Sequence, residues 1–336
     1  MKLLLIYTGG TIGMVQNADG ELQPFAFDGL LAQVPELGRL DVAIDTFQPW
    51  EPLDSSELKP EHWAVLAAAI AERADAYDGF VVLHGTDTMA YTASALSFML
   101  VGLAKPIILT GSQLPIGVLR SDARENVLTA VELALLKESG EPVLREVAVY
   151  FEYQLFRGNR VFKYSSQDFD AFNSPNWPAL ADAGVHLKWD REALLRPEGG
   201  LNLKTNMKAE VGILTLFPGI DASLIRAALL DSGRKVVIVR TYGSGNVPNL
   251  PALDEALAEA RERGVIVINA SQCRRGGVSQ PTYQASRSMR LAGAISAGDM
   301  TLEAVMVKSM WLLGQGLAGA AFQEMFEADL CGERSY

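Results

Sequence analysis

The chain alternates short apolar segments with longer segments of helical periodicity, and this alternation limits the folds that it can adopt. Strands are expected at Leu3–Tyr7, Val42–Phe47, Gly79–Leu83, Pro106–Leu109, Val147–Phe151, Val211–Leu216, Lys235–Arg240 and Val265–Asn269. Several of them lack polar alternation and are rich in Val, Ile and Leu, which is typical of parallel strands buried on both faces. Strands that alternate with helices predict an α/β fold with mostly parallel sheets flanked by helices.

Helices are expected at His62–Tyr77, Met89–Leu103, Asp122–Ser139, Asp221–Asp231, Leu253–Arg263 and Thr301–Gly314. The alternation of strand and helix patterns stops in residues 189–209, which are polar and contain Pro197-Glu198-Gly199-Gly200. A stretch of this composition is typical of a domain boundary. We therefore expect a larger N-terminal domain (1–188), a linker (189–209) and a smaller C-terminal domain (210–336).

Composition excludes several classes of function. With 336 residues, 49% of them hydrophobic, the chain is long enough for two domains with separate cores. Its 40 acidic and 29 basic residues give a net charge of −11, which argues against nucleic acid or an anionic membrane as a partner. The 3 histidines and 2 cysteines form no cluster with metal-ligand spacing, so we expect neither a metal nor a cofactor.

The first apolar run, at Leu3–Tyr7, is about half the length of the apolar core of a signal peptide. No stretch of the sequence approaches a membrane-spanning length. Two cysteines, Cys273 and Cys331, are too few for a disulfide framework, so a reducing compartment is expected. These features together predict a cytoplasmic protein with no membrane partner.

Small, hydroxylic clusters follow four of the expected strands. They are Thr8-Gly9-Gly10-Thr11, Asp54-Ser55-Ser56, His84-Gly85-Thr86-Asp87-Thr88 and Thr110-Gly111-Ser112-Gln113. The carboxyl ends of parallel strands share one edge of a sheet, where ligands bind. The four loops therefore predict one polar pocket, with Asp87 as its carboxylate. Each cluster alone is equally compatible with an ordinary turn or a helix cap.

Two other kinds of site are disfavoured by the same residues. The glycine-rich segment Thr8–Gly13 lacks the G-x-G-x-x-G spacing of dinucleotide sites, and the chain has no phosphate-binding G-x-x-x-x-G-K-[ST] loop. His84 adjoins Thr86 and Asp87, but no serine lies in a G-x-S-x-G turn. His84 is therefore interpreted as a structural residue at the end of its strand.

Taken together, these motifs resemble the bacterial asparaginase family, specifically its type I (cytoplasmic) branch. Further matching segments are Arg157-Gly158-Asn159-Arg160 with Lys163 downstream, and Tyr242-Gly243-Ser244-Gly245-Asn246. The resemblance covers essentially the whole chain. It implies hydrolysis of L-asparagine to L-aspartate and ammonia through an acyl-enzyme. The alternatives are a glutaminase or the ammonia-releasing subunit of an amidotransferase, and a non-catalytic amino-acid sensor.

The resemblance also implies roles for individual residues. Thr11 matches the nucleophile, and Thr86, Asp87 and Lys163 match a second catalytic triad. Asp87 would bind the α-ammonium group of the substrate, and Asp54, Ser55 and Ser56 would orient its α-carboxylate. Lys163 can act as a base only if burial keeps its amine neutral. Backbone amides of the glycine-rich turns are candidates for the oxyanion site.

Three further positions follow from the resemblance. Glu21 stands where the family carries a tyrosine on a mobile loop, so it is a possible lid residue. The family forms dimers and tetramers, and Asn246 is the residue expected to reach a neighbouring subunit's site. A possible regulatory asparagine site is matched in part by Arg240, Ser271, Gln272 and Cys273, although Phe162 stands where that site has a threonine.

Overall fold

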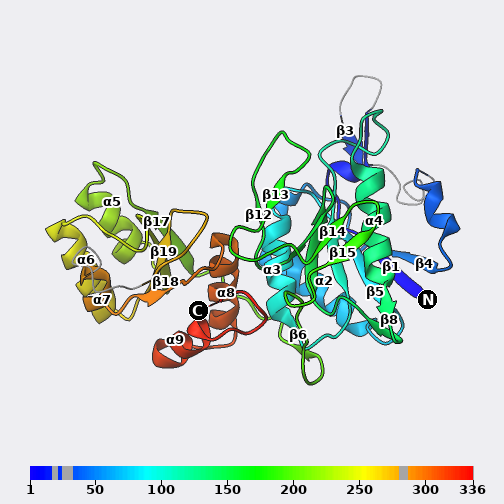
Figure 1. The fold of residues 1–336 in the computed structure, drawn as a ribbon. Coiled ribbons are helices and arrows are strands. Elements are labelled where there is room, and N and C mark those ends of the chain that lie inside the picture. Colours follow the sequence, from blue (N-terminus) through cyan, green and yellow to red (C-terminus); the bar gives the residue numbers. More distant parts are fainter. Residues whose placement is uncertain (17–21, 25–32, 280–286, 336) are drawn as a thin grey trace. The chain divides into compact units, whose positions relative to one another are not determined.

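The structure is a computed structural model that describes residues 1–16, 22–24, 33–279 and 287–335 (Figure 1). The chain divides into two compact units, Met1–Thr205 and Asn206–Tyr336. Each unit has its own mainly parallel sheet and its own apolar core, so the predicted α/β fold is confirmed. The division falls inside the expected linker, whose two boundaries stay a prediction.

The N-terminal unit is built on an eight-stranded sheet in the order β15-β14-β11-β10-β7-β5-β1-β4. Five strands are parallel: β1 (Lys2–Tyr7), β4 (Ala43–Phe47), β5 (Gly79–Leu83), β7 (Ile107–Thr110) and β10 (Val147–Phe151). They coincide with the five strands expected in this half of the sequence. Antiparallel pairing adds β11 (Gln154–Arg157), β14 (Ala181–Ala183) and β15 (Leu187–Trp189). These three were not expected because they are short and contain polar residues.

Helices cover both faces of this sheet. Val81 and Leu83 of β5 pack in one core with Val127 and Val131 of α4 (Ala123–Leu135). Phe80 and Val82, which alternate with them, are equally buried and face the opposite side because strand side chains alternate. That side is covered by α2 (Pro60–Glu72) and α3 (Met89–Met99), which pack on each other. Burial on both faces explains the apolar, non-alternating strands in the sequence.

Each of these helices ends before its predicted end, for a local reason. After α2, Arg73–Ala76 continue only as turns. After α3, the chain enters β6 (Leu100–Val101) and reverses at Gly102, whose φ is +84°. After α4, it forms a hairpin of β8 (Lys137–Glu138) and β9 (Glu141–Pro142), with Ser139 and Gly140 at φ +53° and +87°. The positive φ angles are incompatible with continued helix.

The C-terminal unit contains a parallel four-stranded sheet of β17 (Val211–Thr215), β18 (Val236–Thr241), β19 (Ile266–Ser271) and β20 (Ile295–Ser296). Its helices are α5 (Ala222–Arg226) continued by a π-helical turn η4 (Ala227–Asp231), α6 (Pro251–Glu262), α7 (Arg287–Leu291), α8 (Leu302–Gly314) and α9 (Gly319–Glu327). Val237 and Val239 of β18 pack against Leu253 and Leu257 of α6. The three expected strands and three expected helices are confirmed here, while β20, α7 and α9 were not predicted.

The remaining elements are short connections. They are β2 (Met14–Gln16), β3 (Leu22–Pro24), β12 (Phe162–Lys163), β13 (Phe172–Asn173), β16 (Asn202–Leu203), and three 3₁₀ turns, η1 (Thr11–Gly13), η2 (Pro35–Arg39) and η3 (Ser55–Glu57). Of these, η1, η3 and β12 carry the residues singled out in the sequence.

Candidate active site

Glycines bring the loops after β1, β4 and β5 into direct contact. Gly9 and Gly10 have φ angles of +120° and +90°, a conformation that favours glycine. A Cβ atom on Gly10 would lie 2.4 Å from the Cα of Gly85, and one on Gly9 would lie 2.1 Å from the carbonyl oxygen of Leu53. Since Thr11 follows Gly10 and Thr86 follows Gly85, this backbone contact brings the two threonine loops together.

Thr11 is the first residue of η1 and is half-buried. The turn before it is fixed by the Gly10 N–H, which donates to the Leu53 carbonyl at 3.1 Å. Thr8 differs from Thr11: it is buried, and its hydroxyl donates to the Leu83 carbonyl at 2.9 Å. Thr8 therefore joins β1 to β5, whereas Thr11 is the threonine of this motif that is open to a ligand.

The loop after β4 is organised by Asp54, which caps the turn η3. The Asp54 carboxylate accepts the Ser56 N–H at 2.8 Å. This bond and the Ser56 hydroxyl hold the pKa of Asp54 below its usual value, with a smaller effect from the charge of Lys163. Ser55 is buried against Gly85, and its carbonyl accepts the Thr88 hydroxyl at 2.7 Å. The serine loop is thereby fastened to the loop that carries Thr86.

Lys163 joins two of the expected site residues. Its Nζ donates to Thr86 Oγ1 at 2.8 Å and to Asp87 Oδ1 at 2.6 Å. The Lys163 side chain is 19% exposed and that of Asp87 is 62% exposed, so the ion pair borders open space. Lys163 is therefore part of an ordered polar cluster and is not a solvated loop charge.

The segment before Lys163 is held by buried arginines. Arg157 forms an ion pair with Glu146 at 2.6 Å, with both side chains 3% exposed. Arg160 is fully buried, and its guanidinium lies 5.2 Å from the ring centre of Trp177. The short strand β12 then pairs Lys163 with Phe172 of β13. The Arg-Gly-Asn-Arg motif thus fixes the backbone from which Lys163 extends.

His84 has a structural role, as expected. It is buried at the end of β5, and burial lowers its pKa to about 4. Its Nδ1 lies 2.7 Å from the Gly85 carbonyl and its Nε2 lies 2.8 Å from Thr92 Oγ1, which also accepts the Trp63 indole N–H at 3.0 Å. These partners fit the neutral tautomer that donates from Nδ1 and accepts at Nε2. Thr92, whose hydroxyl meets Nε2, is itself buried on α3.

Gln113 also belongs to this cluster, although no role for it beyond its motif was predicted from the sequence. The Thr86 hydroxyl donates to Gln113 Oε1 at 3.4 Å, and Gln113 Nε2 donates to the Asp168 carbonyl at 2.9 Å. The signal that could have found it is its place after β7, on the same sheet edge as the other loops.

Glu152 lies on the turn between β10 and β11 and is the other residue that the sequence did not single out. Burial raises its pKa to about 7, with a further effect from the negative charges of Asp122, Glu125 and Asp170. Its N–H donates to Asn126 Oδ1 at 3.2 Å. Glu152 therefore borders the residues that support the loop after β7.

The other sequence-predicted positions lie elsewhere. Glu21 falls outside the described residues. Asn246 closes a turn in the C-terminal unit, exchanging backbone hydrogen bonds with Tyr242 at 2.8 and 2.9 Å. At the ends of β18 and β19, Gln272 Nε2 donates to the carbonyls of Leu216 and Arg240 at 2.8 and 2.9 Å.

Ser271 and Cys273 lie beside these residues. The Ser271 hydroxyl donates to the Gly243 carbonyl at 2.6 Å and accepts the Cys273 N–H at 2.9 Å. Cys273 is exposed and forms no disulfide. The Nε of Arg240 is buried and has no hydrogen-bond partner within the described part of the chain. The structure therefore gathers Arg240, Ser271, Gln272 and Cys273 at one sheet edge.

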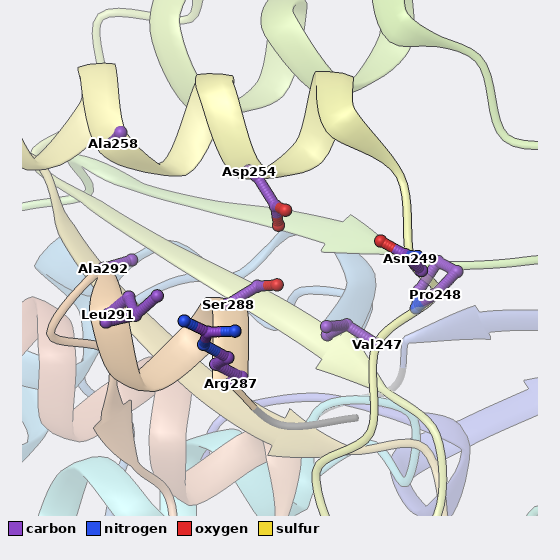
Figure 2. A pocket seen from close by; sticks show the side chains of 9 residues that line it. All are labelled: Val247, Pro248, Asn249, Asp254, Ala258, Arg287, Ser288, Leu291 and Ala292. Carbon is purple, nitrogen blue, oxygen red and sulfur yellow. The ribbon is translucent and has the colours of Figure 1, made fainter. Parts of the chain in front are cut away.

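The C-terminal unit also holds a cavity of 640 Å³, which Figure 2 shows between α6 and α7. Asp254 of α6 points toward Ser288 of α7, and the loop after β18 closes one side (Figure 2). None of the residues predicted from the sequence lines it.

Within the described ranges, no group of three or more His, Cys, Asp and Glu side chains is arranged to hold a metal ion. The same ranges contain no helix that is long and apolar enough to span a membrane.

The chain is a two-domain α/β protein with a threonine–lysine–aspartate cluster at one sheet edge. Two family models match the chain, "Asparaginase, N-terminal" over residues 2–195 and "Glutaminase/Asparaginase C-terminal domain" over residues 210–326. The chain is 41% identical to L-asparaginase 1 of Escherichia coli, over 99% of this chain and 97% of that protein. The chain therefore belongs to the asparaginase family, which confirms the resemblance seen in the sequence.

Solved structures agree with this assignment. L-asparaginase I from Vibrio cholerae superposes with a TM-score of 0.90 at 38% identity, covering 100% of this chain and 99% of that one. The thermostable L-asparaginase from Thermococcus kodakarensis gives a TM-score of 0.90 at 33% identity, covering 100% of both chains.

Proposed function

We propose that this protein hydrolyses L-asparagine to L-aspartate and ammonia through an acyl-enzyme on Thr11. The proposal rests on the cluster in which Lys163 donates to both Thr86 and Asp87. Gly85, directly before Thr86, lies against Gly10, directly before Thr11. This arrangement supports Thr11 as the nucleophile, with the Thr86 hydroxyl and Lys163 as its proton-transfer partners at one sheet edge. Two relatives of similar length are named L-asparaginases.

The proposed mechanism starts with the ion pair between Lys163 and Asp87. The α-ammonium group of the substrate binds at the exposed Asp87 carboxylate and adds a positive charge beside Lys163. A like charge at short range favours the neutral form of the lysine. Lys163 loses one proton to solvent, and Thr86 then passes its hydroxyl proton to the neutral amine while it takes one from the Thr11 hydroxyl, which attacks the side-chain amide carbonyl. Lys163 returns a proton through Thr86 to the leaving nitrogen, which departs as ammonia. In deacylation the same relay takes a proton from water, and the acyl–Thr11 bond breaks to give L-aspartate.

The other groups of the pocket bind and stabilise. Ser55 and Ser56 orient the α-carboxylate, and Asp54 holds their turn through its bond to the Ser56 N–H. Backbone N–H groups of the glycine-rich turns face the developing oxyanion, where one donor contributes on the order of 3–4 kcal/mol. No step requires a metal or a cofactor.

The proposal extends to assembly and regulation. The enzyme acts in the cytoplasm as a homodimer or homotetramer, in which Asn246 reaches the site of a neighbouring subunit. Arg240, Ser271, Gln272 and Cys273 form a second asparagine site. The buried Nε of Arg240, which lacks a partner within the described residues, supports this site.

Ammonia release from L-asparagine and from L-glutamine, each titrated from micromolar to tens of millimolar, tests the proposal. We expect asparagine to be hydrolysed and glutamine to react much more slowly. Comparable rates would indicate a glutaminase or an amidotransferase-type activity, and no ammonia from either would indicate an amino-acid sensor. A sigmoidal asparagine curve would support the second site, and a hyperbolic one would contradict it.

Two threonine variants test the nucleophile. Thr11→Ala should abolish turnover and leave the fold intact, because Thr11 lies on a half-buried loop. Thr8→Ala is the matched control from the same motif: it should keep turnover and lower stability by about 1 kcal/mol, since a buried hydrogen bond is lost. Near-normal turnover in Thr11→Ala would overturn the assignment.

A further inference from the structure

We propose that Gln113 is a positioning residue, whose side-chain carboxamide fixes the direction in which the Thr86 hydroxyl points. The inference rests on the proposed function, in which Thr86 transfers a proton. Two sets of hydrogen bonds support it. One set holds the backbone of Gln113, and the other orients its carboxamide.

The backbone of Gln113 is anchored by a buried carboxylate. The N–H groups of Gln113 and Leu114 donate to the two oxygens of Asp122 at 2.9 and 3.1 Å. Asn126 Nδ2 donates both to Asp122 Oδ2, at 3.2 Å, and to the Gly111 carbonyl, at 3.0 Å. The Gln113 side chain therefore extends from a loop that α4 holds on both sides of it.

The carboxamide is oriented by its second contact. Its Nε2 donates to the backbone carbonyl of Asp168 at 2.9 Å, so its oxygen faces Thr86. The Asp168 backbone is itself fixed, because its N–H donates to Ser165 Oγ at 3.0 Å and its carboxylate accepts the Ser165 hydroxyl at 2.8 Å. Gln113 thus links Thr86 to the loop that follows Lys163.

The Thr86 hydroxyl has one proton and two lone pairs, so its hydrogen bonds decide where it can accept a further proton. Lys163 Nζ donates into one lone pair of Thr86 Oγ1 at 2.8 Å, and the proton points to Gln113 Oε1 at 3.4 Å. The remaining lone pair is left to accept a proton from the nucleophile or from water, and in that step the Thr86 proton turns from Gln113 Oε1 to the neutral amine of Lys163. The 3.4 Å contact is long, as catalytic hydrogen bonds often are before substrate binds.

The first test is Gln113→Met, which keeps the length of the side chain and removes both its donor and its acceptor. We expect kcat for asparagine to fall about 10- to 100-fold, because small errors in the position of a proton-transferring group have effects of that size. KM should stay within about 3-fold, since Gln113 is assigned no contact with substrate. Gln167→Met is the matched control: Gln167 is an exposed residue of the 165–168 loop, and turnover should be unchanged.

A second variant shows whether Gln113 acts through Thr86. Thr86→Ser keeps the hydroxyl and removes the methyl group that restricts its rotation. The loss of kcat caused by Gln113→Met should therefore be larger in the Thr86→Ser background than in the wild type. Equal losses would overturn the proposal, because Gln113 would then act elsewhere.

The other outcomes are also decisive. Unchanged kcat, raised KM alone, or faster turnover in Gln113→Met would each overturn the assignment. If that variant fails to fold, Gln113→Asn, which keeps the carboxamide one methylene short of Thr86, must show the same loss of kcat. A wild-type protein that hydrolyses asparagine while Gln113→Met behaves normally overturns this inference alone. A wild-type protein without activity overturns the proposed function and this inference with it.

Discussion

At the scale of a single residue, burial keeps the imidazole of His84 neutral. Its neutral imidazole is held between the Gly85 carbonyl and the Thr92 hydroxyl at 2.7 and 2.8 Å. Burial lowers its pKa from 6.5 to about 4, so between these values the unfolded chain binds a proton that the folded chain does not. Stability is therefore lost as the pH falls through that window.

The expected contribution of His84 is a loss of about 2 kcal/mol between pH 7 and pH 5, taken as the difference between the wild type and a variant without this imidazole, since the raised pKa of Glu152 acts in the opposite direction over the same range. Denaturant unfolding at the two pH values measures it. His84→Gln, whose amide can both donate and accept, should remove this pH dependence. His186→Gln is the matched control, because His186 is exposed, and it should leave the dependence as in the wild type. An equal pH dependence of stability in the wild type and in His84→Gln would contradict the prediction.

Single residues also mark how far the sequence can predict the site. Thr11, Thr86, Asp87 and Lys163 lie in recognisable motifs, so the sequence could name them. Gln113 stands in such a motif too, but its role depends on a contact with the Asp168 carbonyl, 55 residues away in the chain. A backbone acceptor carries no signature in the sequence, and contacts of that kind need coordinates.

At the scale of elements, the strands were easier to predict than the helix ends. Strands such as β1 and β5 are nearly continuous apolar runs because both faces are buried, and that property can be read directly from composition. The end of α4 is decided by the hairpin of β8 and β9, in which Ser139 has φ +53°. Tertiary pairing overrides local propensity there, so residues predicted as helix form strands instead.

The contact between the loops after β1 and β5 gives a prediction at this scale. Gly10→Ala should reduce turnover about 100-fold or more, because its Cβ would lie 2.4 Å from the backbone of Gly85 and would push the two threonine loops apart. Stability and ammonia release are the measurements.

Gly140→Ala separates that clash from backbone strain alone. Gly140 has φ +87°, close to the +90° of Gly10, but no atom lies within 4 Å of its Cβ position. This variant should cost about 1–2 kcal/mol of stability and keep turnover. If both variants lost turnover equally, strain and not the loop contact would be responsible.

At the scale of the whole molecule, a buried ion pair joins the last described residues to the rest of the C-terminal unit. Lys308 of α8 and Glu333 form an ion pair with both side chains 0% exposed. Lys308 Nζ also donates to the carbonyls of Phe326 and Ala328 at 2.8 and 2.6 Å. Glu333 accepts the N–H groups of Leu330 and Cys331 at 3.1 and 2.9 Å. One buried pair therefore joins α8, the end of α9 and the C-terminal segment.

Removing one partner should be costly because the other charge is left buried. Lys308→Met should destabilise the protein by about 3–5 kcal/mol, and the double variant with Glu333→Gln should lose less than the sum of the two single losses. Denaturant unfolding measures the free energies, and hydrogen exchange of residues 328–335 should rise in Lys308→Met. Arg226→Met is the control from the same unit: its ion pair with Glu259 is exposed, so its effect should be small. Additive losses in the double variant would show that the pair does not act as one unit, and the C-terminal segment would then be held by its backbone contacts alone.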